Sequence, residues 1–326
     1  PIYVLAWGVL LAGFIQLLIQ IAPLKSIHRL PTPKLNFNNQ GIKKFFIVIL
    51  PAILAGGIIQ INLLVDTIFA SLLETGSPTW LYVSDRLVQF PMGIFAIAVG
   101  TVLLPALSKL DINKEKIIFI NSIKKGQKFV LFIGIPSLIG LMFCAEDLIS
   151  TIFYRGAFTE LDVLRSSYSL IAFSFGLPFF MLMKVLTPAF FARKDTKTPM
   201  YVAIVSLLLN ASLNYLLAFT FGLGHIGIAI GSSIAALISV IILELILYRD
   251  GFFKIQSIFN RFNLMLLAAS SALIIFLYFF TSWTNFLELN QIERLFFLFI
   301  EIIISVVIYF SISRLVFMRP LREIFD

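Results

Sequence analysis

An arginine stands inside a long apolar run, in the stretch Trp80-Leu-Tyr-Val-Ser-Asp-Arg-Leu-Val-Gln-Phe-Pro91. Tyr82, Arg86 and Gln89 are spaced i, i+4 and i+7, so they share one face of a helix, and Asp85 adjoins them. Charged groups within a membrane span are costly and usually face a cavity or a partner. The planar donor fork of arginine suits phosphate. The pattern therefore indicates either a contact for an anionic headgroup or a structural ion pair between Arg86 and an acid on another helix.

A second polar set joins two other apolar runs. Asp66 follows Asn62 by one helical turn, and Ser206, Asn210 and Asn214 form a stripe at i, i+4 and i+8. Carboxylate and amide oxygens are ligands that hard cations such as Na⁺ prefer. If the two helices face each other, Asp66, Asn210 and Asn214 form a candidate cation site. The alternative is interhelical hydrogen bonding, which asparagine commonly supplies in membranes.

Three further charged residues lie in apolar runs, and none suggests catalysis. Lys184 is far enough from the end of its run that its amine does not easily reach water, whereas Glu244 and Glu301 lie nearer predicted ends and are expected to reach the interface or pair locally. The sequence contains no Gly-x-Ser-x-Gly elbow, no P-loop and no His/Cys cluster at metal-ligand spacing. We therefore predict no catalytic residue, no enzyme activity and no cofactor beyond the candidate Na⁺.

The composition indicates that these polar residues lie on membrane-spanning helices. Of 326 residues 60% are hydrophobic and 13% are charged, which exceeds what a soluble core accommodates. A span needs about 20 apolar residues. Nine stretches meet this requirement, at about 2–22, 45–72, 80–107, 129–149, 164–191, 200–221, 225–247, 263–281 and 292–317. The fold class predicted is all-α, a polytopic transmembrane helix bundle.

The basic residues predict how the bundle is oriented. Of 25 Lys and Arg residues, three lie well inside predicted spans (Arg86, Arg165 and Lys184), and the loops and adjoining span ends of one side hold only Arg155 and Arg294. The other 20 lie in the alternate loops and the C-terminal segment, which by the positive-inside rule face the cytoplasm. The +8 net charge therefore reflects loops beside anionic lipid, with no nucleic-acid partner expected. The Lys-rich segment 112–125 is expected to be either an interfacial amphipathic helix or a solvated helical loop.

Three blocks of sequence resemble the MurJ (MviN) family of lipid II flippases. The first runs from Phe69-Ala-Ser through Trp80-Leu-Tyr, Asp85-Arg-Leu and Phe90-Pro to Ala98-Val-Gly-Thr-Val-Leu-Leu-Pro105. The second is Phe153-Tyr-Arg-Gly-Ala-Phe-Thr159, and the third runs from Lys184 through Pro188-Ala-Phe-Phe-Ala-Arg-Lys-Asp195 to Thr198-Pro199. The blocks occur in the family's order, and the resemblance covers essentially the whole chain.

The resemblance implies an incomplete 14-span exporter fold of two lobes. Residues 1–24 match the last helix of a truncated N-terminal lobe, 25–44 a cytoplasmic loop, and 45–250 a complete six-helix lobe. Residues 251–326 match two additional helices that form a lipid groove, followed by a cytoplasmic tail. Because an apolar run begins directly at Pro1, we expect that upstream sequence is missing and that the absent lobe is a partner of this part.

The resemblance also implies a function. Lipid II, an undecaprenyl-diphosphate-linked disaccharide-pentapeptide, would cross the bacterial inner membrane by alternating access for cell-wall synthesis, with Arg86, Asp85, Tyr82, Gln89 and Lys184 contacting substrate. Alternatives are a related exporter of another polyprenyl-linked glycan and a cation-coupled drug antiporter of the same fold. Some family members bind Na⁺ on helices matching those of Asp66, Asn210 and Asn214. Here Asn214 and Gln89 are amides where acids are common, which counts against ion coupling and leaves the transport class unaffected.

Overall fold

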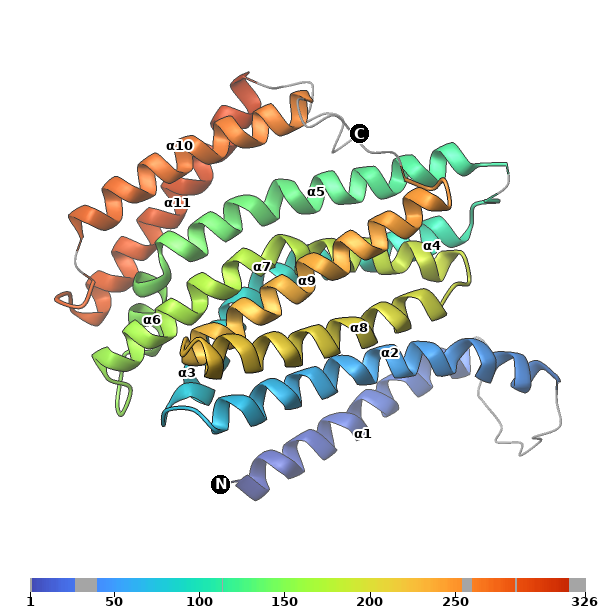
Figure 1. Cartoon of the computed structure of the whole chain (residues 1–326), viewed down its shortest axis with the longest axis horizontal. Coiled ribbons are helices and arrows are strands. Elements are labelled where there is room, and N and C mark those ends of the chain that lie inside the picture. Colours follow the sequence, from blue (N-terminus) through green and yellow to red (C-terminus); the bar gives the residue numbers. More distant parts are fainter. Residues whose placement is uncertain (1, 27–39, 113, 254–259, 285, 317–326) are drawn as a thin grey trace. The chain divides into compact units, whose positions relative to one another are not determined.

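The structure is a computed structural model of the chain, and it describes residues 2–26, 40–112, 114–253, 260–284 and 286–316. These residues form helices joined by short loops, without a strand among them (Figure 1). They group into two compact units, residues 1–47 and residues 48–326. The predicted all-α class is confirmed for the part of the chain that is described.

The first unit holds helix α1 (Ile2–Ser26) and the first turns of α2 (Gln40–Ser71). Helix α1 exposes apolar side chains over most of its length, among them Trp7, Phe14 and Leu18. A helix that is apolar all round is stable in lipid or against other helices.

The second unit continues α2 and contains eleven further described helical segments. They are α3 (Ser77–Pro91), η1 (Met92–Ala96), α4 (Ile97–Ser108), α5 (Lys116–Phe143), α6 (Ala145–Phe153), α7 (Glu160–Ala192), α8 (Lys197–Asn214), η2 (Tyr215–Thr220), α9 (Gly224–Arg249), α10 (Arg261–Trp283) and α11 (Gln291–Val316). Helices α10 and α11 pack against each other, α10 also contacts α5, and α11 contacts α6 (Figure 1).

Eight helices of the described chain are long and apolar enough to cross a membrane. They are α1, the continuous α3–η1–α4 segment, α5, α7, the continuous α8–η2 segment, α9, α10 and α11. The predicted second span, 45–72, coincides with α2, in which Gly56–Ser71 forms a shorter apolar stretch. The chain is therefore a multi-pass membrane protein.

The predicted span at 129–149 has the wrong limits. Helix α5 begins at Lys116 and ends at Phe143, and the separate short helix α6 follows Cys144. The reason is that Phe119 and Ile123 are buried, so the Lys-rich segment before the predicted span already packs as part of the same helix. Residues 116–125, expected to be an interfacial amphipathic helix or a solvated helical loop, are helical and continuous with the rest of α5.

Helix α7 is the centre of the second unit. It packs against α3, α4, α5, α6 and α9, and its side chains Leu177, Met181 and Val185 are fully buried. A capping box between Thr159 and Asp162 fixes its start. Helix α4 approaches α7 closely at Gly100, where an added Cβ would lie 2.7 Å from the carbonyl oxygen of Lys184.

Two helices contain a π-helical turn next to a predicted polar site. The turn η1 begins directly after Pro91, and η2 begins directly after Asn214. Proline cannot donate a backbone hydrogen bond, so it disturbs the helix in which it lies. Such single π-turns occur frequently at functional sites.

Candidate functional site

Helix α3 is fixed to α7 by two side-chain hydrogen bonds. The indole Nε1 of Trp80 donates to Asp162 Oδ1 at 2.7 Å, and the hydroxyl of Ser84 donates to the carbonyl oxygen of Ser166 at 2.7 Å. Trp80 and Ser84 are both buried. These contacts set the rotation of α3, which leaves the face that carries Arg86 exposed.

Arg86 forms a cluster with Tyr82, Asp85 and Gln89, which we call the Arg86 cluster. Its guanidinium lies over the Tyr82 ring, 4.6 Å from the centroid, and Nη1 donates to Gln89 Oε1 at 3.2 Å. The amide of Gln89 in turn donates to Asp85. Among the described residues Arg86 makes no ion pair with another helix, so most of its five donors stay available to an anion.

Lys184 does not join this cluster. It is half-buried on α7, and its backbone faces Gly100 of α4. Gly100 follows Arg86 by 14 residues along the continuous α3–η1–α4 segment, which corresponds to about 20 Å at 1.5 Å per residue. A single small headgroup cannot contact both residues in this conformation.

Asp66 is surrounded by amides from α8 and a hydroxyl from α9. Its Oδ1 accepts hydrogen bonds from Asn210 Nδ2 at 2.8 Å and Asn214 Nδ2 at 2.6 Å, while Ser232 Oγ lies 3.5 Å from Oδ2. Asn210 Nδ2 also donates to Asn62 Oδ1 at 2.8 Å. The structure therefore brings Asp66, Asn210 and Asn214 together. We call Asn62, Asp66, Asn210, Asn214 and Ser232 the Asp66 cluster.

The donor chemistry of the Asp66 cluster fits a hard cation. Asp66 supplies a carboxylate, and Asn214 Oδ1 is buried without a partner, packed against Gly231. The amide nitrogens of Asn210 and Asn214, however, point toward the carboxylate. Rotation of these two amides would present their oxygens instead. The arrangement as it stands is the interhelical hydrogen-bond network that was the alternative for these residues.

The two clusters are electrostatically connected. The carboxylate of Asp85 lies close enough to that of Asp66 to repel it, so an anion at Arg86 and a cation at Asp66 would influence each other. The Arg86 cluster lies on α3 alone, whereas the Asp66 cluster is formed by α2, α8 and α9.

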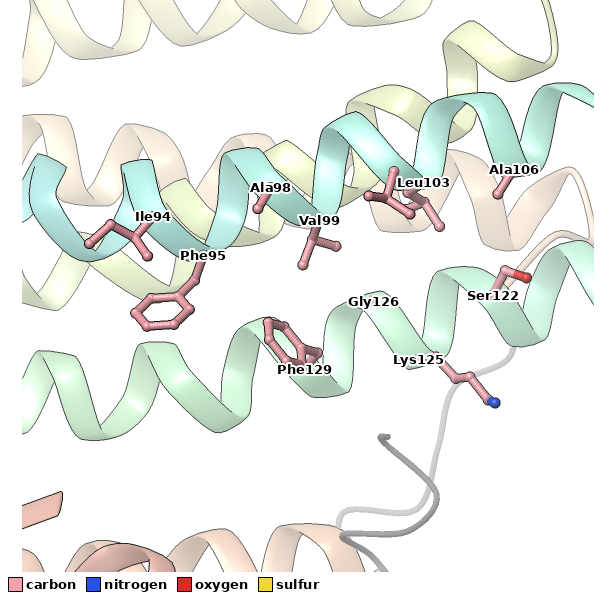
Figure 2. A pocket seen from close by; sticks show the side chains of 11 residues that line it. Ile94, Phe95, Ala98, Val99, Leu103, Ala106, Ser122, Lys125, Gly126 and Phe129 are labelled. Atoms are coloured by element: carbon pink, nitrogen blue, oxygen red, sulfur yellow. The ribbon is translucent and has the colours of Figure 1, made fainter. Parts of the chain in front are cut away.

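An apolar groove lies between α4 and α5, away from both clusters. It has a volume of about 480 Å³, and Figure 2 shows Phe95 and Phe129 facing each other across it, with Ser122 and Lys125 at one end. None of the predicted site residues lines this groove. Its lining suits a hydrocarbon chain better than a charged headgroup.

Comparison with known proteins identifies the family. The family model for the lipid II flippase MurJ matches residues 1–304. A probable lipid II flippase MurJ of Vibrio cholerae is 40% identical over 251 residues, which are 77% of this chain and 47% of the relative. The lipid II flippase MurJ of Burkholderia cenocepacia is 31% identical over 277 residues, covering 84% of this chain and 53% of the relative.

The chain belongs to the lipid II flippase MurJ family. It spans about half the length of the curated MurJ relatives it matches. A solved structure of a lipid II flippase MurJ in an inward closed conformation matches with 29% identity and a TM-score of 0.70. The matched region comprises 90% of this chain and 59% of the solved chain. A MATE structure in complex with MaD5 matches with 15% identity and a TM-score of 0.54, over 85% of this chain and 65% of the solved chain. This likeness shows a shared fold only.

Some of the residues that form these contacts were not predicted from the sequence. Ser232 joins the Asp66 cluster from α9, but a serine in an apolar helix carries no distinctive signal. Glu301 was expected to reach the interface or pair locally; it is fully buried and accepts a hydrogen bond from Cys144, a partner that the sequence did not indicate. Glu244 accepts one from Gln127 at 2.7 Å, which agrees with local pairing.

Proposed function

We propose that this protein, as part of a complete MurJ, moves lipid II from the cytoplasmic to the outer leaflet of the bacterial inner membrane. The observation that supports this most strongly is the match to the lipid II flippase family along residues 1–304. No covalent bond is made or broken in this process. Two lobes rock about a central cavity, which shields the headgroup while the polyprenyl tail stays in lipid. The second lobe is the part that residues 45–250 supply.

Arg86 is the proposed contact for the diphosphate. Its guanidinium is exposed and unpaired by any acid of the described helices, and Tyr82 and Gln89 hold its orientation. A diphosphate would accept two parallel hydrogen bonds from the guanidinium. Asp85 keeps Gln89 in place through its hydrogen bond, so it acts on Arg86 indirectly. Lys184 would meet the headgroup at a different depth of the membrane.

The Asp66 cluster is the proposed site for Na⁺. Asp66 would supply the negative charge. The remaining oxygen ligands would come from the side chains of Asn62, Asn210, Asn214 and Ser232. Occupation of this site would neutralise a carboxylate next to Asp85 and thereby change the potential at Arg86. This is a direct physical route from a cation to the substrate contact.

The first test is complementation of a flippase-depleted strain with the full-length protein. Arg86→Ala should fail to rescue growth, and Arg86→Lys should rescue poorly because lysine lacks the planar donor fork. Arg165→Ala is the matched control, since Arg165 lies on α7 and its guanidinium is already paired with Glu74 at 3.5 Å. Full rescue by Arg86→Ala at normal expression would remove Arg86 from the mechanism.

A second transport function remains consistent with the fold. The MATE likeness and the oxygen-rich Asp66 cluster would also suit a cation-coupled antiporter or an exporter of another polyprenyl-linked glycan. Flipping assays in liposomes with lipid II and with a different polyprenyl-diphosphate glycan distinguish these cases. Equal transport of both substrates would favour the broader exporter.

A further inference from the structure

A group of acidic and thiol side chains lies where α6 meets α11, outside both clusters described above. Cys144 stands at the junction of α5 and α6, and its Sγ donates to Glu301 Oε1 of α11 at 3.1 Å. Asp147 lies in the first turn of α6. Glu301 is 0% exposed and Asp147 is 7% exposed, so both carboxyl groups are removed from solvent.

Each of these carboxyl groups has an oxygen without a partner. Asp147 Oδ2 and Glu301 Oε2 are buried and accept no hydrogen bond in the described chain. The same holds for the hydroxyls of Thr151 and Ser305, which lie one turn beyond Asp147 and Glu301 respectively. Unpaired polar atoms are normally avoided in a protein interior, so their concentration at one helix contact indicates a missing ligand.

Two arginines of the helices that surround this contact are already engaged. Arg294 of α11 donates to the carbonyl oxygens of Phe286, Leu287 and Ser150. On α7, Arg165 pairs with Glu74. The lysines of α5 lie at its other end, 16 or more residues and therefore at least about 24 Å before Cys144.

Some acidic residues of the packed helices repel Asp147, and the others are hydrogen-bonded elsewhere. Glu146 of α6 and Glu301 both repel Asp147. On α7, Glu160 accepts a hydrogen bond from Tyr154, and Asp162 accepts from Trp80 and Thr159. No described cation is among the groups that act on Asp147 or on Glu301.

We infer that Asp147 and Glu301 form a proton-binding site that holds one proton between the six-helix lobe and the C-terminal helix pair. Two unpaired carboxylates cannot be buried side by side, so one of them takes up a proton. Because Glu301 already accepts from the Cys144 thiol, Asp147 is the residue that carries it. Burial, followed by repulsion from Glu301 and Glu146, raises the pKa of Asp147 to about 8. The proton fits better than a metal, since no described group of three or more His, Cys, Asp or Glu residues could hold one.

This inference does not rest on the proposed transport of lipid II, and its consequence concerns how α11 is held against the lobe. At neutral pH the protonated Asp147 leaves a single negative charge at the contact of α6 with α11. Above about pH 8 a second charge appears there and repels the first. The attachment of α11 to the lobe should therefore weaken with rising pH.

Infrared difference spectroscopy tests the proposal in the purified full-length protein. The wild type should show a protonated-carboxyl carbonyl band at pH 7 that disappears as the pH rises through about 8. Asp147→Asn should lose this band. Glu301→Gln should keep a titrating band with its midpoint shifted to lower pH, because one source of repulsion is gone. Glu146→Gln, the control from the adjacent position, should shift the midpoint of the titration less than Glu301→Gln does.

A second measurement covers the case in which Glu301→Gln does not fold. Unfolded Asp releases its proton near pH 3.8 and folded Asp147 near pH 8, so the folded state binds the extra proton in between. The melting temperature of the wild type should therefore fall relative to Asp147→Asn as the pH rises from 4 to 8. An unchanged band in Asp147→Asn, or removal of the band by Na⁺ at constant pH, would overturn the proton assignment.

Discussion

At the scale of single residues, two arginines of this chain show how surroundings decide what a charge can do. Arg294 is 6% exposed, and its guanidinium is consumed by the carbonyl oxygens of Phe286, Leu287 and Ser150. Arg86 is exposed and donates one hydrogen bond, to Gln89. Arg294 therefore joins α11 to α6, whereas Arg86 can receive an anionic ligand.

The Asp66 cluster yields a prediction about sodium. If Na⁺ binds there, sodium at about 100 times its Kd should add roughly 2.7 kcal/mol to the free energy of unfolding. Asn210→Ala should abolish this increment, because Asn210 contacts both Asn62 and Asp66. Thermal unfolding of the full-length protein in NaCl and in choline chloride measures the difference.

The control for this measurement comes from the same helix. Ser206 belongs to the α8 stripe one turn before Asn210, but it makes no hydrogen bond to the Asp66 cluster. Ser206→Ala should therefore keep the sodium effect. If the wild type is stabilised equally by both salts, the cluster is a hydrogen-bond network only.

The polar residues could be found from the sequence, but their partners could not. The spacing of Asn210 and Asn214 places both on one face of a helix, and Asp66 lies about one turn from Asn62. Which helices face each other depends on tertiary packing, and so does the burial of Glu301. An isolated glutamate near the end of a run gives no sign of the thiol that meets it.

At the scale of elements, the close approach of α4 to α7 depends on Gly100. A Cβ at this position would lie 2.7 Å from the carbonyl oxygen of Lys184, which is backbone and cannot move aside. Gly100→Ala should therefore destabilise the protein by ~1–3 kcal/mol through overpacking. Thermal unfolding in detergent measures the loss.

Gly93→Ala provides the matched substitution in the same continuous helical segment. An added Cβ at Gly93 meets nothing within 4 Å, so the change should be neutral or stabilise by up to about 1 kcal/mol through helix propensity. Equal stability of the two variants would show that α4 and α7 are farther apart than in this structure.

The elements differ from the sequence prediction mainly where two signals conflict. Lysines at 116–128 suggested that the span starts near 129, yet Phe119, Ile120 and Ile123 between them are buried, and α5 starts at Lys116. The π-turns η1 and η2 could not be predicted, because Pro91 and Asn214 mark a disturbance without specifying its form. Long apolar periodic segments such as α7, α9 and α10 were predicted to within a few residues.

At the scale of the whole molecule, the bias of basic residues predicts which loops lie on each side of the membrane. The loop that carries Lys114 is expected in the cytoplasm, and the loop that carries Arg155 is expected outside. Both side chains are exposed. Cys144 is the sole cysteine of this chain and is 4% exposed, so it should not interfere with labelling of introduced cysteines.

Cysteine labelling in spheroplasts tests this orientation in the full-length protein. Arg155→Cys should react with a membrane-impermeant maleimide in intact spheroplasts, whereas Lys114→Cys should react only after permeabilisation. The protein without either substitution is the control and should show no label from Cys144. Reaction of Lys114→Cys in intact spheroplasts would reverse the orientation.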